Sequence, residues 1–283
     1  STGRSSLRAD AVRLGNNDAS NRGRLGTEGT SATAGELNVE GRLVELAGNL
    51  RLQGMGRSEF TGTEAVRVAG VTRTDAQCRL EDTATLESTG DLLLRGGVVA
   101  PTTYATTTLR ATGRDVRIEH AGAAASGPVG SAAGSLRIEA RNIAQAGRLA
   151  APLGRIELAA TGTLTLEAGS ETSVAAAPGQ VLPLGQVQNG NRWVINLDPA
   201  NVPSGQVAID GLPDKAVSLN GSTVQVQAGA DLVVAGGGDV QAYEFAVFQA
   251  NPITSSQSFL VVRQAPDNLT GIPDPSLLLL LGI

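Results

Sequence analysis

Three short stretches, Val116-Arg117-Ile118, Leu136-Arg137-Ile138 and Ile156-Glu157-Leu158, decide how this chain folds. In each stretch, one aliphatic residue stands on either side of a charged residue, and successive stretches begin 20 residues apart. Alternate residues of a β-strand point to the same face, so each stretch predicts a short strand with two inward side chains. A fixed return interval predicts a chain that coils around one axis and lays each strand on the last. We therefore expect Val116, Leu136 and Ile156 to lie in one ladder.

Similar aliphatic pairs recur through the rest of the chain at less regular intervals. Gly, Ser, Thr and Asn between the pairs predict frequent turns, and there is no sustained helical periodicity. The sequence thus predicts an all-β fold, a parallel β-helix (β-solenoid) of roughly ten to twelve coils. The clearest other pairs are Val12/Leu14, Leu37/Val39, Leu50/Leu52, Val66/Val68, Leu92/Leu94, Val217/Leu219, Val224/Val226 and Leu232/Val234.

Changes in composition divide the chain into four predicted parts. Residues 1–177 are expected to form β-helix coils. Residues 178–213 contain five prolines, which central strands exclude, and they surround an Asn-Gly hairpin signal, so we predict a hairpin insertion sealed by Trp193. Residues 214–262 are expected to form terminal coils, and residues 263–283 an extended tail. The aromatic residues predicted to cap these coils or to mediate assembly are Tyr243, Phe245, Phe248 and Phe259.

Charge and composition exclude several classes of protein. A net charge of −5 argues against nucleic-acid binding, which needs a concentrated basic surface. The longest apolar run, 277–281, is too short to span a membrane. Cys78 is the only cysteine, so neither an internal disulfide nor a thiolate metal site is expected; we interpret it as a small buried residue, with a reactive thiol as the alternative.

The charged residues between the aliphatic pairs are candidates for a contact strip. With the coils in register, we expect Arg117 to stack on Arg137 and Glu119 on Glu139, with Arg155 and Glu157 on the next coil. A solvated face that resists aggregation is one interpretation, and a contact surface for host or matrix glycans is the other.

No catalytic, cofactor-binding or metal site is predicted. The single histidine, His120, leaves little room for a nucleophile–base pair and none for a multi-histidine metal site; we interpret it as a solvated corner residue. The acidic residues are spread along the chain, whereas glycan-cleaving enzymes need convergent carboxylates.

One run in the second half of the chain resembles a known family. It comprises Asn189-Gly190 before Trp193-Val194, then Leu212-Pro213-Asp214-Lys215-Ala216-Val217-Ser218-Leu219-Asn220-Gly221, and then Gly236-Gly237-Gly238-Asp239-Val240-Gln241-Ala242-Tyr243-Glu244-Phe245. In this order it is similar to a recurring unit of the large filamentous-haemagglutinin-like exoproteins of Gram-negative bacteria, which are exported by two-partner secretion. The resemblance implies a right-handed parallel β-helix that serves as the repeat shaft of a secreted surface adhesin, with an outer-membrane transporter as its export partner.

We therefore predict a structural, non-enzymatic role as the shaft of an extracellular or cell-surface adhesin or fibre, acting in attachment or biofilm. A first alternative is the protomer of a homopolymeric filament that assembles head to tail, because open solenoid ends present unpaired strand edges. A second is a glycan-active β-helix enzyme, which would require a cleft with two close carboxylates. The predicted partners are neighbouring coils or copies of the chain, and host or matrix glycans; neither nucleic acid nor a cofactor is expected.

Overall fold

A computed structural model of the chain describes residues 3–16, 34–74, 79–122, 127–188, 191–197, 205–235, 237–249, 256–264 and 279–281. These residues form strands, turns and bends, with no helix among them. They belong to two compact units: unit 1 comprises residues 1–176 and 213–236, and unit 2 comprises residues 177–212 and 237–283. The chain thus leaves unit 1 once, returns to it, and leaves it again.

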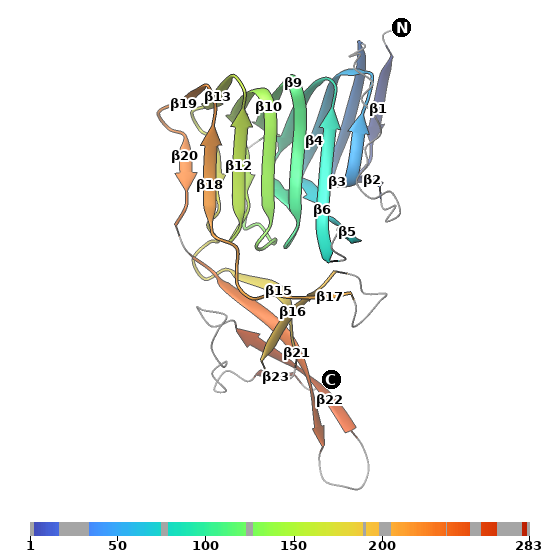
Figure 1. Cartoon of the computed structure of the whole chain (residues 1–283), viewed down its shortest axis with the longest axis vertical. Helices are drawn as coiled ribbons and strands as arrows, with labels where there is room; N and C mark the ends of the chain where they lie inside the picture. Colours follow the sequence, from blue (N-terminus) through green and yellow to red (C-terminus); the bar gives the residue numbers. More distant parts are fainter. Residues whose placement is uncertain are drawn as a thin grey trace. The chain divides into compact units, whose positions relative to one another are not determined.

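Unit 1 is an all-β structure whose strands pair in three parallel ladders, here named A, B and C (Figure 1). Ladder A joins β1 (Arg4–Arg8), the start of β3 (Gly35–Leu52), the start of β4 (Met55–Ala69), β7 (Asp91–Gly96), the end of β9 (Thr106–His120), the end of β10 (Ser135–Ala146), β13 (Thr163–Leu166) and β19 (Thr223–Val226). Ladder B joins β2 (Ala11–Asn16), the middle of β3, the end of β4, β8 (Val99–Pro101), β11 (Arg148–Ala150), β14 (Glu171–Ser173) and β20 (Asp231–Val233). Ladder C joins the end of β3, β6 (Leu80–Ser88), the starts of β9 and β10, β12 (Arg155–Ala160) and β18 (Ala216–Asn220).

The described chain passes through the ladders in the order A, B, C and then returns to A. We call one turn of the chain through the ladders a passage. In the part that the structure describes, the connection from the end of β9 to the start of β10 is the one that crosses from ladder A to ladder C without a strand in ladder B. A short excursion follows β4, where β5 (Val71–Thr74) pairs antiparallel with the start of β6.

Long strands serve two or, in β3, three ladders, and two of their bends lie at glycines with positive φ. In β9 the bend lies at Gly113, whose φ of 68° is in the left-handed region that favours glycine. In β3 it lies at Gly48, also at φ 68°, where an added Cβ would stand 2.3 Å from the carbonyl oxygen of Asn16.

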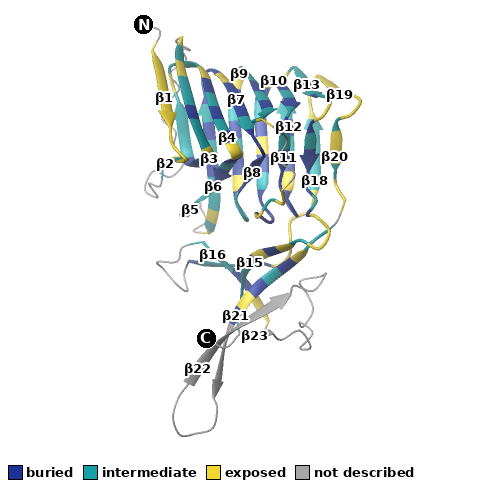
Figure 2. Cartoon of the chain, turned by 180° about the vertical axis from the view of Figure 1, so that it is seen from behind, coloured by how far each residue is buried: buried dark blue, intermediate teal, exposed yellow. Residues whose placement is uncertain are grey.

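The core of unit 1 lies inside the ladders and is built almost wholly from aliphatic side chains. Buried and less buried residues alternate along many of the strands (Figure 2). In β9, Val116 and Ile118 are buried whereas Arg117 and Glu119 are only half-buried. Phe60 is the one aromatic residue in the main core cluster of the described residues. Each fully buried aliphatic side chain contributes roughly 1.5–3 kcal/mol relative to exposure.

The predicted strand pairs all lie in or directly beside strands, but the predicted ladder is only partly right. Leu136 pairs with Ile156 in ladder C, as expected. Val116 lies in ladder A instead, between Leu92 and Ile143. The partner of Leu136 in β9 is Thr107, because β9 places its first part in ladder C and its second part in ladder A.

Within the described residues, the ladders contain fewer strands than the predicted number of coils. Ladder A, the longest, has eight strands in the described residues, against an expected ten to twelve coils. Many passages are longer than the 20 residues on which the expectation rested; Val116 and Ile143, for example, are partners at a separation of 27 residues.

Unit 2 is a separate six-stranded sheet. Its strands are β15 (Val181–Gln188), β16 (Arg192–Asn196), β17 (Gln206–Ala208), β21 (Asp239–Gln249), β22 (Ser256–Gln264) and β23 (Leu279–Leu281). The predicted hairpin is confirmed: β15 and β16 pair antiparallel, with Gln188 opposite Arg192. Trp193 is 9% exposed, and its indole Nε1 donates a hydrogen bond of 2.7 Å to the carbonyl oxygen of Leu184.

Residues 214–262, which were predicted to form terminal coils, divide between the two units. The ladders resume over β18, β19 and β20, which end at Val233. After them, β21 pairs parallel with β15 and antiparallel with β22, so residues 239–264 belong to unit 2. The predicted extended tail contains β23, which pairs with β22. The parallel partner of β21 is thus β15 of the insertion and not a strand of ladder A, B or C.

Candidate functional site

The outward positions of ladders A and C carry two networks of ion pairs. The ladder A network consists of Arg57, Glu59, Arg95, Glu119, Arg117 and Glu167. The ladder C network consists of Arg51, Glu87, Arg110, Glu139, Arg137 and Glu157. In both, every contact joins an arginine to a glutamate, and most contacts join residues on different strands that are far apart in the sequence.

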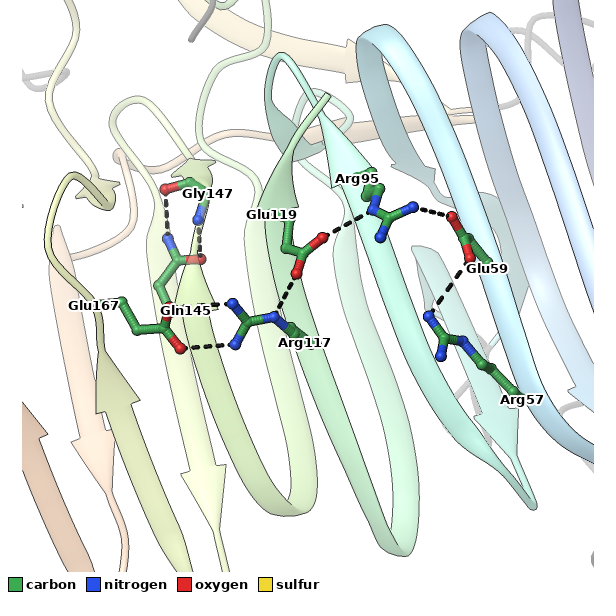
Figure 3. Close-up of polar contacts among 8 residues, drawn as sticks. All are labelled: Arg57, Glu59, Arg95, Arg117, Glu119, Gln145, Gly147 and Glu167. Carbon is green, nitrogen blue, oxygen red and sulfur yellow. Dashed lines mark hydrogen bonds and ion pairs between the residues drawn. The ribbon is translucent and has the colours of Figure 1, made fainter. Parts of the chain in front are cut away.

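In the ladder A network, each inner side chain contacts two partners of opposite charge (Figure 3). Arg95 donates to Glu59 at 2.5 Å and to Glu119 at 2.8 Å. Arg117 donates to Glu119 and also forms a two-pronged contact with Glu167, at 2.7 and 3.1 Å. These contacts link β4, β7, β9 and the turn after β13.

The ladder C network follows the same rule on neighbouring strands. Arg110 donates to Glu87 at 3.1 Å and to Glu139 at 2.5 Å. Arg137 donates to Glu139 at 2.5 Å and to Glu157 at 2.8 Å. The network therefore runs across β6, β9, β10 and β12.

The three glutamates of the predicted strip are its most enclosed charges: the side chains of Glu119 and Glu157 are each 26% exposed and that of Glu139 is 24% exposed. Partial burial opposes ionisation of Glu119, but hydrogen bonds from Arg95 and Arg117 outweigh it and lower the pKa of this carboxyl. Burial likewise opposes ionisation of Glu139, and hydrogen bonds from Arg110 and Arg137 lower its pKa. Both carboxylates therefore stay ionised at neutral pH.

The predicted single strip is wrong in its register. Arg117 does not stack on Arg137, nor Glu119 on Glu139, because the first residue of each pair lies in ladder A and the second in ladder C. The ladder partner of Arg137 is Glu157, and that of Glu119 is Arg95. Like charges are thus replaced by opposite charges on adjacent strands.

Arg155 stands apart from both networks. It is exposed at the start of β12, with Ser135 and Ala216 as its ladder partners. No ion pair involves it within the described ranges.

Sequence reasoning missed several polar residues inside the core, and Gln145 is one of them. Its side chain is fully buried, and its Nε2 donates to the carbonyl oxygen of Gly147 at 3.1 Å (Figure 3). The same Nε2 donates to the carbonyl oxygen of Glu171 at 3.0 Å. Its Oε1 accepts a hydrogen bond of 3.3 Å from the Gly147 N–H. The signal was present in the alternation, since Gln145 takes the inward place that Ile118 and Leu166 take in adjacent strands.

A second missed feature is a row of short polar side chains where ladder A strands begin. The Asp91 Oδ1 accepts a hydrogen bond from the Asp115 N–H at 3.0 Å. Asp115 accepts one from the Asn142 amide at 2.9 Å, and the Asn142 Oδ1 accepts one from the Thr163 N–H at 2.9 Å. These hydrogen bonds hold neighbouring ladder A segments in register, and we interpret the row as structural.

The remaining predicted residues fall in several places. Tyr243 lies on β21 and is 38% exposed, whereas the side chains of Phe245, Phe248 and Phe259, on β21 and β22, are outside the described residues. Cys78 is also outside them. His120 ends β9, with its Nε2 3.4 Å from the carbonyl oxygen of Gly169.

Comparisons with family models, with curated proteins and with solved structures found no match. Over the described ranges, no helix has the length and apolar character needed to cross a membrane. Over the same ranges, no group of three or more His, Cys, Asp or Glu side chains is placed to hold a metal ion.

Proposed function

We propose that the chain is part of the shaft of a secreted adhesin or extracellular fibre of a Gram-negative bacterium, and that unit 1 is wound as a right-handed parallel β-helix. The observation that carries the proposal is the recurring order of ladders A, B and C, with parallel pairing at each step. Parallel pairing of successive passages moves a chain steadily along one axis. The right hand follows the general preference of connections between parallel strands and the family resemblance of residues 189–245.

A winding of this kind is suited to act as a spacer. Each passage buries its aliphatic side chains against the passage before and the passage after it, so passages can be added without a new fold. The length of such a shaft depends on the number of passages, at about 4.8 Å each.

We assign the two ion-pair networks to the stability and solubility of the shaft. Their inner members contact opposite charges on neighbouring strands, so these charges are paired within the protein. Flat, uncharged sheet surfaces invite aggregation, and alternating charges oppose it. A general acid at neutral pH needs a raised pKa, and the lowered pKa values of Glu119 and Glu139 do not fit that role.

Export and attachment belong to the same proposal. They rest on the resemblance of the run from Asn189 to Phe245 to the repeat unit of two-partner-secreted adhesins. We therefore propose an extracellular or cell-surface location, an outer-membrane transporter as export partner, and a role in attachment or biofilm.

Deletion of one whole passage tests the shaft proposal. Ile143 and Leu164 are partners in ladder A, so residues 142–162 make up one passage through the three ladders. The full chain would be anchored in the outer membrane of a Gram-negative host through its first residue, with a ligand-binding domain fused after its last. We expect the chain without residues 142–162 to retain surface display, protease resistance and attachment of cells to the immobilised ligand.

The matched control removes residues 142–151, which deletes the ladder A and B segments of that passage and leaves β12 behind. We expect this variant to lose at least about tenfold in surface display, because the next strand then reaches the wrong ladder. The proposal would be contradicted if both deletion variants kept surface display equally, or if both lost it equally.

A further inference from the structure

The first and last strands of ladder A expose the ends of the same inward column. Leu7 on β1 is 45% exposed, and Val226 on β19 is 56% exposed. Between them every member of the column is 0% exposed. The column runs Leu7, Val39, Phe60, Leu94, Ile118, Gln145, Leu166 and Val226.

Ladder B ends in the same way. Leu232 on β20 is 45% exposed, whereas the five residues before it in its column are 0% exposed. That column runs Val12, Val44, Val66, Val99, Leu149, Thr172 and Leu232. Val224 and Val234, at 43% and 55%, are exposed beside these ends. Five of the eight exposed large apolar side chains described thus lie at the two ends of the ladders.

We propose that a second copy of this chain docks end to end on unit 1, with its β1 and β2 added beside β19 and β20 as the next parallel strands. Among the described strands, β1 and β2 pair only with β3, β19 only with β13, and β20 only with β14. Over the described residues, no further strand lies on the outer side of β1, β2, β19 or β20, and strand edges of this kind can template further pairing. Because every ladder is parallel throughout, the first strand of one copy runs in the same direction as the last strand of the other.

When the ladders continue from one copy into the next, aliphatic side chains of the two copies lie against each other in the interior. Leu7 of the incoming copy covers Val226, and its Val12 covers Leu232. The contact removes apolar side chains from water at both ends at once, which is the main favourable term in such association.

Charge does not oppose this contact. The incoming end carries Arg4, Arg8 and Arg13. On the receiving end β18 and β19 contain no charged residue, and β20 contains only Asp231. A head-to-tail contact of this kind does not close on itself, so repeated docking gives a linear filament. Self-assembly goes beyond the role of a shaft, which does not require it.

Sedimentation velocity of the full chain tests the docking, from about 1 to about 200 µM. We expect the weight-average mass to rise at least about threefold over this range. Leu7→Lys and Val226→Asp each place a charge at one end of the column and should keep the chain monomeric. An equimolar mixture of the two variants should assemble again, because the introduced lysine of one variant can meet the introduced aspartate of the other, and the unchanged ends can meet each other.

Val181→Asp is the matched control, since Val181 is equally exposed, at 46%, but lies on β15 of unit 2. This variant should assemble like the unchanged chain. A chain that stays monomeric throughout, assembly that ignores both end variants, or a mixture that fails to assemble would each overturn the proposal. The deletion experiment is read on single anchored chains, so its outcome does not depend on self-assembly.

Discussion

Gln145 shows at the scale of single residues how the interior of unit 1 accepts a polar group. The side chain lies in an otherwise apolar column, yet its amide bonds to main-chain atoms of Gly147 and Glu171. A buried polar group that keeps its partners costs little, whereas the same partners left alone cost about 1–3 kcal/mol. Gln145 therefore connects the turn between β10 and β11 to β14 in ladder B.

Substitution Gln145→Leu tests this role. The leucine fits the column but leaves the main-chain atoms of Gly147 and Glu171 without the amide, so we expect a loss of about 1–3 kcal/mol in the free energy of unfolding. Urea denaturation would measure it. Leu166→Met, in the same column, is the control and should cost less than about 1.5 kcal/mol. An unchanged midpoint for Gln145→Leu would show that the hydrogen bonds are dispensable.

Asp82 predicts an unusual dependence of stability on pH. Its carboxyl group faces Gly70, where an added Cβ would lie 2.4 Å from it, and burial raises its pKa from 3.8 to about 6. The folded state therefore holds this proton more tightly than the unfolded state does. The contribution of Asp82 to stability is greatest below about pH 4 and is lost as the pH rises through 6.

Asp82→Asn removes that titration. We expect the variant to be about 1–2 kcal/mol more stable than the unchanged chain at pH 7.5, and the difference to shrink as the pH falls to 4. Chemical denaturation of both proteins at several pH values would measure the difference. A difference that is constant with pH would mean that Asp82 titrates normally.

Sequence alternation identified inward residues correctly but not their ladder partners. Leu136 and Ile156 proved to be neighbours, whereas Val116 belongs to another ladder. The period of two fixes which face a side chain occupies, but the partner depends on how many residues each turn consumes. The bend at Gly113, which moves β9 from ladder C to ladder A, has no effect on the alternation.

At the scale of strands, the two ion-pair networks replace the like-charge stacking expected from a fixed interval. Arg117 and Arg137 are 20 positions apart but lie on different ladders, and each has glutamate partners. The sequence supplied the charged residues of the candidate strip. The opposite-charge pairing followed only from the true register.

Glu139→Gln tests how much the ladder C network contributes. Glu139 lies 2.5 Å from both Arg110 and Arg137, and its replacement leaves these two guanidinium groups without a shared carboxylate. We expect a loss of about 1 kcal/mol at low salt that shrinks in about 1 M salt, because added ions screen the charges.

Glu36→Gln is the matched control, since its pair with Arg4 spans 3.5 Å between well-exposed side chains. It should change stability by less than about 0.5 kcal/mol at either salt concentration. Equal losses for the two variants would contradict the assignment of the network to stability.

At the scale of the whole molecule, the sequence predicted the interruption of the ladders but not the second sheet. The prolines and the Asn-Gly signal marked the insertion, and β15 and β16 form its hairpin. The later segment 239–264 has the alternation of a strand, which does not reveal that its partner is β15. Pairing between segments distant in the sequence is a tertiary choice that local patterns do not encode.

The spacing of positions along one outward column tests the central claim, that successive passages stack along a single axis. Ser6, Ala144 and Gln225 belong to one column of ladder A, with Ala144 five steps and Gln225 seven steps from Ser6. Spin labels would be placed pairwise at these positions in a Cys78→Ser background and their distances measured by double electron–electron resonance. Stacked passages predict about 24 Å for Ser6–Ala144 and about 34 Å for Ser6–Gln225, each as a narrow distribution. A Ser6–Gln225 distance no longer than that of Ser6–Ala144, or broad distributions for both pairs, would contradict the account.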